Sequence, residues 1–121
     1  MKYSLGIGTD IESIERFENL NKVKKRNFFD KVYTPIELEY CYSQKNVAEK
    51  LAMYFCGKEA VIKALSSIGY NDIYRNNIDI SEKMFNVFEV KLLQNPSNIK
   101  LSISLSLNES KAIAYAIAFI R

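Results

Sequence analysis

The sequence predicts an α+β domain in which a small antiparallel sheet packs on one long helix, with short helices beside it. One observation behind this is a helical pattern from Asn46 to about Ser66, roughly 30 Å long at 1.5 Å per residue. The other is a C-terminal half in which apolar and polar residues alternate, as they do in strands that bury one face. Because 121 residues contain no repeat or flexible linker, we expect a single domain over residues 1–121.

The N-terminal third predicts one strand and two short helices. The strand is expected to end at Asp10, because apolar residues alternate with smaller ones before it: Tyr3, Leu5 and Ile7. A helix should follow the cap residue Ser13, since apolar residues recur every three positions: Ile14, Phe17 and Leu20. Thr34 and Glu37 have capping-box spacing around Pro35, which predicts a second helix that runs to about Ser43.

The long helix is expected to begin at the N-cap Asn46, with Glu49 as its capping partner. Its apolar stripe contains Val47, Leu51, Phe55, Ile62 and Leu65. Beside the stripe runs a ridge of small residues: Ala48, Ala52, Cys56 and Ala60. Such a ridge predicts that another element packs closely against the helix.

The C-terminal half predicts three strands. The first covers Val87 to Leu93, and a turn follows at Asn95 to Asn98. The second alternates core and polar residues from Ile99 to Asn108. The third begins at Ala112, and its alternate alanines would allow a helix to pack closely on the sheet.

Composition excludes several classes of chemistry. The chain has no histidine, which rules out an imidazole base and histidine zinc ligands within it. Two cysteines, Cys41 and Cys56, are too few for a disulfide framework, so we expect reduced thiols and a cytoplasmic protein. No apolar stretch approaches the length of a signal peptide core or a membrane span, and no membrane contact is expected.

Positive charge is concentrated near the N-terminus. The formal net charge is +3, yet residues 16–31 alone carry Arg16, Lys22, Lys24, Lys25, Arg26 and Lys31 against Glu18 and Asp30. This run is either a solvated helix face or a docking surface for an acidic partner. A small RNA-binding domain, with stacking by Tyr33, Tyr40 and Tyr42, is a rival interpretation, but we expect no specific nucleic-acid binding.

Asp10 at a strand end, with Glu59, Lys58 and Lys63 on the long helix, could form a Mg²⁺ site. Mg²⁺ is commonly held by one or two carboxylates plus water and substrate phosphates, and the lysines would offset phosphate charge. The alternative is that Glu59 and Lys63 form an ordinary ion pair at i,i+4 spacing. Lys58 lies on the apolar stripe, where an ammonium group needs an anion or a subunit partner.

Several segments, taken in order and spacing, resemble the holo-acyl-carrier-protein synthases, which are small phosphopantetheinyl transferases. The resemblance covers most of residues 5–65 and resumes from Ile103. The segments are Gly6-Ile7-Gly8-Thr9-Asp10, Arg16-Phe17, Tyr33-Thr34-Pro35-Ile36-Glu37 and Phe55-Cys56-Gly57-Lys58-Glu59-Ala60-Val61-Ile62-Lys63-Ala64.

The resemblance implies transfer of 4′-phosphopantetheine from coenzyme A to a serine of apo-acyl carrier protein. The products would be holo-acyl carrier protein, used in fatty acid biosynthesis, and adenosine 3′,5′-bisphosphate. By the same resemblance Asp10 and Glu59 hold Mg²⁺, and Asp10, Glu59 and Lys63 form the catalytic set. The serine proton would pass to Glu59 or to water on the ion, while Lys63 steadies the leaving phosphate.

Further implied contacts involve both substrates. Lys58, Lys63 and Ser106 match positions near coenzyme A, and Arg16 matches a residue that pairs with the acidic carrier protein. Arg26 and Lys31 belong to the basic run that would extend this partner surface. The family is commonly homotrimeric, with active sites between subunits.

The sequence departs from the family pattern near the phosphates of the coenzyme. Tyr54 replaces an arginine, Leu107 replaces a histidine, and only Gly69 remains of a glycine-rich stretch. A different cation, such as Lys45 or Lys50, would then have to bind the 3′-phosphate. The departures leave open a weakened or inactive homologue that keeps the fold and binds carrier protein.

Overall fold

The computed structural model describes residues 4–20, 24–94 and 98–120. Lys22 of the basic run and most of the predicted turn at residues 95–98 lie outside the described residues. In the described part of the chain, none of the helices is long and apolar enough to cross a membrane.

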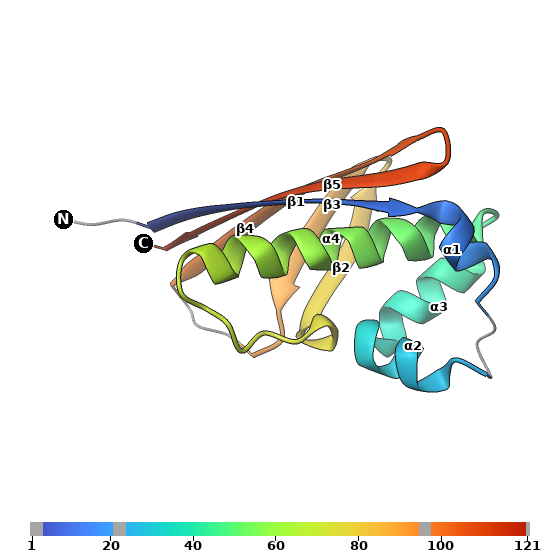
Figure 1. The fold of residues 1–121 in the computed structure, drawn as a ribbon, viewed down its shortest axis with the longest axis horizontal. Helices are drawn as coiled ribbons and strands as arrows, with labels where there is room; N and C mark the ends of the chain where they lie inside the picture. Colours follow the sequence, from blue (N-terminus) through green and yellow to red (C-terminus); the bar gives the residue numbers. More distant parts are fainter. Residues whose placement is uncertain (1–3, 21–23, 95–97, 121) are drawn as a thin grey trace.

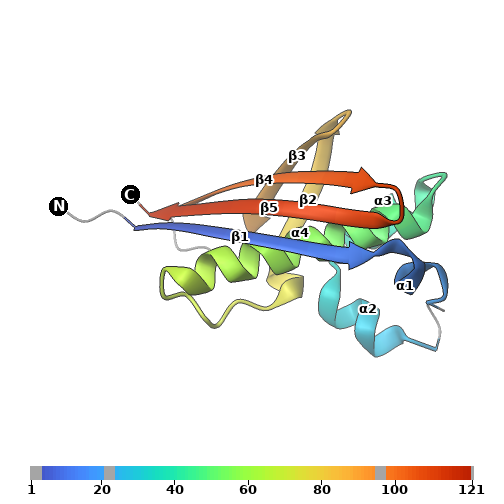
Figure 2. The same cartoon turned by 45° about the horizontal axis from the view of Figure 1, so that its top comes forward.

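A three-stranded antiparallel sheet packs along the long helix α4 (Val47–Ser67), as Figures 1 and 2 show. Its strands are β1 (Ser4–Ser13), β5 (Lys111–Ile120) and β4 (Ile99–Asn108), in the order β1-β5-β4. The long helix, the β4 and β5 strands and the antiparallel pairing are therefore as the sequence predicts.

The remaining elements flank this pair of layers. The hairpin of β2 (Ile78–Met84) and β3 (Val87–Leu92) lies beside β4. Three short helices gather at one end of α4 (Figure 1): α1 (Ile14–Glu18), α2 (Arg26–Val32) and α3 (Pro35–Ser43). A single 3₁₀ turn, η1 (Arg75–Asn77), leads into β2.

Glycine lets β1 pass directly over α4. A Cβ at Gly8 would lie 1.9 Å from the carbonyl oxygen of Ala60, and one at Gly6 would lie 2.0 Å from that of Ala64. These neighbouring atoms belong to the helix backbone, which cannot shift to accommodate a side chain. Close contact between β1 and α4 therefore requires glycine at both positions of the Gly-x-Gly pattern. The ridge of small residues on α4 is therefore matched by small residues on the strand.

Alanines of β5 provide the rest of the close contact, since four of them are at most 1% exposed: Ala112, Ala114, Ala116 and Ala118. The opposite face of the sheet is open; it is largely apolar on β1 and β5 and polar on β4, which contributes Lys100, Ser102, Ser104 and Ser106. Cross-strand partners place Leu5 beside Phe119 and Ile7 beside Ile117 on that face. Ile7 is 62% exposed and Ile117 is 46% exposed, so this face lacks a cover in the single chain.

Helix α3 begins as predicted. The Glu37 backbone N–H donates to Thr34 Oγ1, and the Thr34 N–H donates to Glu37 Oε1, which closes the capping box around Pro35. Ser13 and Asn46 are the N-cap residues of α1 and α4, as predicted, but neither makes a capping side-chain hydrogen bond.

Three element boundaries differ from the sequence-based expectation. Strand β1 continues to Ser13 because pairing with β5 extends to Ser13 and Lys111, so Asp10 lies within the strand and not at its end. Helix α2 was not predicted, since its N-cap Lys25 makes no capping side-chain hydrogen bond and the helix is held by burial of Phe29 and Val32. Strand β2 was not predicted either, because only Ile78 and Ile80 of its residues are buried.

Candidate active site

The candidate site lies where β1 crosses the middle of α4. Asp10 is fixed there by two α4 residues: the thiol of Cys56 donates to its backbone oxygen (3.1 Å), and the ammonium of Lys63 contacts its Oδ1 (3.1 Å). Lys63 also donates to the Thr9 carbonyl at 3.0 Å. Asp10 is thereby tied to the α4 segment between residues 56 and 63.

Glu59 belongs to that same segment. Positions i, i+3 and i+7 of a helix share one side, so Cys56, Glu59 and Lys63 are neighbours along α4. The structure therefore brings Asp10 and Glu59, which are 49 positions apart in the sequence, to one side of α4. The side chains of Asp10 and Glu59 are 11% and 16% exposed, accessible but largely covered.

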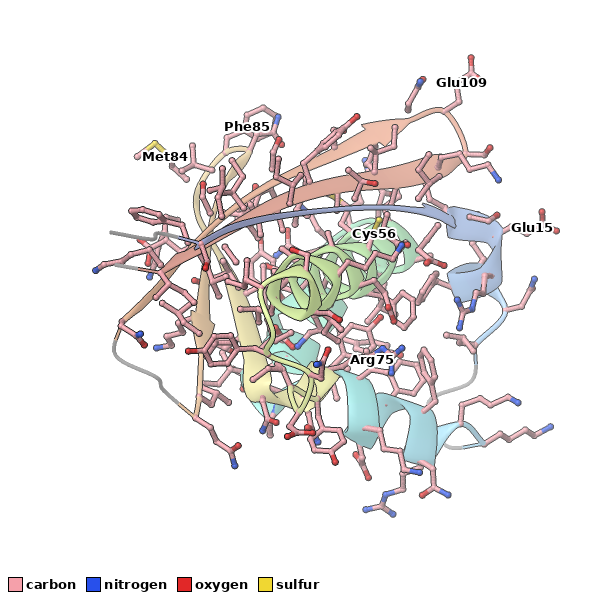
Figure 3. The ribbon with its side chains drawn as sticks, turned by 60° about the vertical axis from the view of Figure 1, so that its left-hand side comes forward. Glu15, Cys56, Arg75, Met84, Phe85 and Glu109 are labelled. Atoms are coloured by element: carbon pink, nitrogen blue, oxygen red, sulfur yellow. The ribbon has the colours of Figure 1, made fainter. Side chains whose placement is uncertain are left out.

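The ordinary i,i+4 ion pair between Glu59 and Lys63 is not formed. Lys63 pairs with Asp10, and Glu59 pairs with Arg75, whose Nε lies 2.5 Å from Glu59 Oε1. Arg75 belongs to η1 and is not among the predicted site residues, because its local sequence pattern gives no indication that it contacts α4. In Figure 3 it lies on the side of α4 away from the sheet, toward the short helices.

The second carboxylate oxygen of Asp10 is unusual. Asp10 Oδ2 is buried, and it has no hydrogen-bond partner among the residues that the structure describes. A buried carboxylate oxygen without a donor is costly unless a cation or a water molecule satisfies it. This oxygen, with Glu59 nearby, fits a hard cation such as Mg²⁺.

The described residues contain no group of three or more His, Cys, Asp or Glu side chains placed to hold a metal ion. A cation at Asp10 and Glu59 would accordingly take its other ligands from water and substrate. Mg²⁺ is the ion that commonly binds with so few protein ligands.

Burial also acts on neighbours of Asp10. It raises the pKa of Glu12 to about 7, assisted by a side-chain hydrogen bond with Asp10 and by the Asp10 charge, and opposed by Arg16. It raises the pKa of the Cys56 thiol as well, again with help from Asp10, so this thiol stays protonated and acts as a donor. Figure 3 shows Cys56 between α4 and the sheet, where it is fully buried.

Arg16, a predicted partner-binding residue, lies at the edge of this site. It pairs with Glu12 at 3.0 Å, and its guanidinium lies 4.8 Å from the ring centroid of Phe55. About half of its side chain is exposed (49%). These contacts hold the guanidinium in place while leaving it accessible to a partner.

Arg26 and Lys31 are both exposed on α2. Arg26 makes a long ion pair with Asp30 (4.0 Å), which leaves its charge largely available. Helix α2, which carries both residues, contacts η1, whose Arg75 pairs with Glu59.

The Lys58 ammonium is buried and already paired, so the predicted phosphate contact of Lys58 is wrong. Its side chain is completely buried, and its ammonium pairs with Glu37 Oε1 (2.7 Å) and donates to the carbonyls of Arg75 (2.9 Å) and Ile78. Burial lowers the pKa of Lys58 and raises that of Glu37, while their mutual attraction opposes both shifts. Glu37 is thus the anion that neutralises the buried Lys58 ammonium. Through these bonds Lys58 links α4 to α3 and β2.

Ser106 lies elsewhere on the chain. It lines a pocket of about 650 Å³ formed by β4, the start of α4 and the β2–β3 hairpin, together with Lys45, Lys50 and Leu107. Asp10, Glu59 and Lys63 do not line this pocket. Within one chain the structure therefore does not bring Ser106 to the carboxylates, but it does place Ser106 with the two lysines expected to replace the missing arginine.

Tyr54 is a core residue here. It is 1% exposed, stacks on Tyr40 with ring centroids 6.0 Å apart, and meets Phe88 edge-on. Where the sequence departs from the family pattern at this position, a charged side chain has been replaced by a packed aromatic ring.

Known proteins resemble this chain in both sequence and structure. The model of the 4′-phosphopantetheinyl transferase superfamily matches residues 6–118. A holo-[acyl-carrier-protein] synthase of Clostridium perfringens is 35% identical, with 93% of this chain and 92% of the relative covered. The same enzyme of Halothermothrix orenii is 36% identical, with 93% and 94% covered. The crystal structure of Helicobacter pylori holo-[acyl-carrier-protein] synthase in complex with coenzyme A superposes with a TM-score of 0.77 at 31% identity, covering 93% of this chain and 98% of that one.

Proposed function

Since the chain belongs to the 4′-phosphopantetheinyl transferase superfamily, we propose that it is a holo-acyl-carrier-protein synthase. It transfers 4′-phosphopantetheine from coenzyme A to a serine of apo-acyl carrier protein and releases adenosine 3′,5′-bisphosphate. The roles given to this chain's own residues are supported by one contact: Lys63, one helical turn from Glu59 on α4, contacts the Asp10 carboxylate.

Mg²⁺ fits the two carboxylates, and Asp10, through its buried Oδ2, and Glu59 would hold the ion. When bound, the ion would neutralise negative charge on the diphosphate of coenzyme A. Lys63, 55% exposed, can move from Asp10 to the leaving phosphate and offset the charge that develops there.

The reaction forms a bond between the serine oxygen and the phosphorus next to pantetheine, and it breaks the bond from that phosphorus to the bridging oxygen of the diphosphate. Glu59 accepts the serine proton, and adenosine 3′,5′-bisphosphate leaves. Phosphoryl transfer of this kind depends mainly on positioning and charge neutralisation, so it needs no histidine.

We propose that the partner surface consists of Arg16, Arg26 and Lys31, which are exposed on α1 and α2. An acidic carrier protein complements this charge and would dock its serine beside Glu59. The expected cytoplasmic location fits this pair of substrates, and we expect no nucleic-acid or membrane partner.

The protein is proposed to act as a homotrimer. The open sheet face of β1 and β5 is largely apolar, with Leu5, Ile7 and Ile11 all more than half exposed. A second copy of the chain would cover it and could bring a Ser106 pocket to a neighbouring chain's carboxylates. Sedimentation of Ile117→Glu tests this: the variant should be monomeric, and an unchanged trimer, or a monomeric wild-type protein, would contradict it.

Transfer itself is tested by incubating the protein with apo-acyl carrier protein, coenzyme A and Mg²⁺ and weighing the carrier protein by mass spectrometry. We expect the mass to rise by one phosphopantetheine arm, and no gain when the acceptor serine of the carrier protein is replaced by alanine. No mass gain at high enzyme concentration would refute the proposal. Carrier protein that binds without gaining mass would instead identify an inactive homologue.

A further inference from the structure

Arg75 is a charged residue next to the proposed metal site that the proposed mechanism does not use. Its Nε lies 2.5 Å from Glu59 Oε1, and its guanidinium lies 5.6 Å from the ring centroid of Phe55. The Arg75 side chain is 43% exposed, whereas Glu59 is 16% exposed. Arg75 therefore covers Oε1 of Glu59, a proposed metal ligand.

The backbone at Arg75 is held in place by its surroundings. Its carbonyl oxygen accepts a hydrogen bond from the buried ammonium of Lys58 at 2.9 Å. The turn η1 is closed by a hydrogen bond from the Asn77 N–H to the Tyr74 carbonyl, and the Asn76 side chain donates to the Asp30 carbonyl on α2. Because the chain is fixed on both sides of Arg75, the fold keeps the Arg75 side chain within reach of Glu59.

The carboxylates of the proposed metal site already have cationic partners. Asp10 and Glu59 carry two negative charges, and Lys63 and Arg75, their ion-pair partners, carry two positive ones. These four charges cancel, and the Glu12 carboxyl beside Asp10 is itself paired with Arg16, so a divalent ion would bind where the carboxylates already have cationic partners. Of the carboxylate oxygens, Asp10 Oδ2 is unpartnered among the described residues, but Glu59 Oε1 is occupied by Arg75.

We propose that Arg75 and the divalent ion compete for Glu59. Arg75 is then a positioning residue: it holds the Glu59 carboxylate in place in the metal-free protein and lowers the affinity for the ion. The negative charge of a bound diphosphate would shift this competition toward the ion, which couples metal binding to substrate binding. The inference rests on the metal site of the proposed function.

The experiment measures Mn²⁺ binding by electron paramagnetic resonance, without coenzyme A, to wild-type protein, Arg75→Gln and Lys83→Gln. Lys83 is a matched control, because it also pairs with one carboxylate, Glu89, on the β2–β3 hairpin (3.9 Å). A partly exposed ion pair is worth up to about 1 kcal/mol, so Arg75→Gln should bind Mn²⁺ about two- to fivefold more tightly. Lys83→Gln should match wild type.

A second measurement follows Arg75 directly. The Nε–H signal of Arg75, assigned by its loss in Arg75→Lys, should be protected from solvent exchange in the metal-free protein. Saturating Mg²⁺ should shift this signal and remove the protection. A signal that keeps both its position and its protection would overturn the competition.

Failure of the inference can be told apart from failure of the proposed function. Equal or weaker Mn²⁺ binding by Arg75→Gln, in a protein that transfers phosphopantetheine, refutes only the role of Arg75. Absence of Mn²⁺ binding by the wild-type protein refutes this inference and the metal assignment together. Circular dichroism of each variant verifies that it folds.

Discussion

Replacement of Lys58 by methionine should destabilise the fold strongly. Lys58 and Glu37 are 0% and 1% exposed, and the ammonium bonds to Glu37 Oε1 and to two backbone carbonyls. Methionine fills a similar volume but leaves the Glu37 carboxylate buried without a counter-ion, although the N–H groups of Thr34 and Ile80 still donate to it. Removal of one partner from a buried pair costs about 3–5 kcal/mol.

The double variant Lys58→Met with Glu37→Gln removes both buried charges. Its loss of stability should be about 2–3 kcal/mol smaller than the sum of the two single losses, because neither charge is left alone. Urea unfolding measures all three variants, and unchanged m-values confirm that the comparison is two-state. The control Lys91→Met, at an exposed position on β3, should stay within about 0.5 kcal/mol of wild type.

Two results would refute this reasoning about Lys58. One is a loss below about 1 kcal/mol for the single variant, which would place the ammonium in solvent. The other is strict additivity in the double variant, which would mean that the two charges do not interact.

Three further predictions concern close packing, pH and partner binding. Gly8→Ala should cost at least about 2 kcal/mol in urea unfolding, because its Cβ would meet the Ala60 carbonyl at 1.9 Å. Burial, with the hydrogen bond to Glu82, raises the pKa of Tyr40 to about 12, so the folded protein holds this proton more tightly than the unfolded chain. Stability should therefore fall as the pH rises from about 10 to 12, and less steeply in Tyr40→Phe. Arg16→Glu should raise the KM for carrier protein roughly tenfold and leave the KM for coenzyme A unchanged.

Each of these predictions has a contradicting outcome. Wild-type stability in Gly8→Ala would mean that β1 does not touch α4. A pH dependence of stability that is the same in Tyr40→Phe would remove Tyr40 as its source. A changed KM for coenzyme A in Arg16→Glu would place Arg16 at the other substrate.

Features that depend on local sequence were predicted well. The Thr34 capping box spans four residues, and the alternation of β5 is visible along a single segment despite the helix propensity of alanine. The small-residue ridge of α4 correctly indicated a closely packed partner, which proved to be the β1 glycines and β5 alanines.

Features that depend on distant contacts were missed. Lys58 pairs with Glu37, and Glu59 pairs with Arg75, because α3 and η1 pack on α4. No periodic pattern in the sequence predicts this packing. Helix α2 has no capping side chain to indicate its start, and β1 runs past Asp10 because its partner β5 continues. Conversely, Glu12 and Arg16 have i,i+4 spacing, a signal that could have placed Glu12 at the edge of the site.

The central claim is that Asp10 and Glu59 together support transfer, and their replacement by alanine tests it most directly. Phosphopantetheine transfer is measured by mass for Asp10→Ala, Glu59→Ala and the control Glu15→Ala, whose side chain points away from the molecule in Figure 3. The first two should lose activity by a factor of about a hundred or more while they keep wild-type circular dichroism, and the control should stay active. Near-normal turnover in either Asp10→Ala or Glu59→Ala would contradict the account.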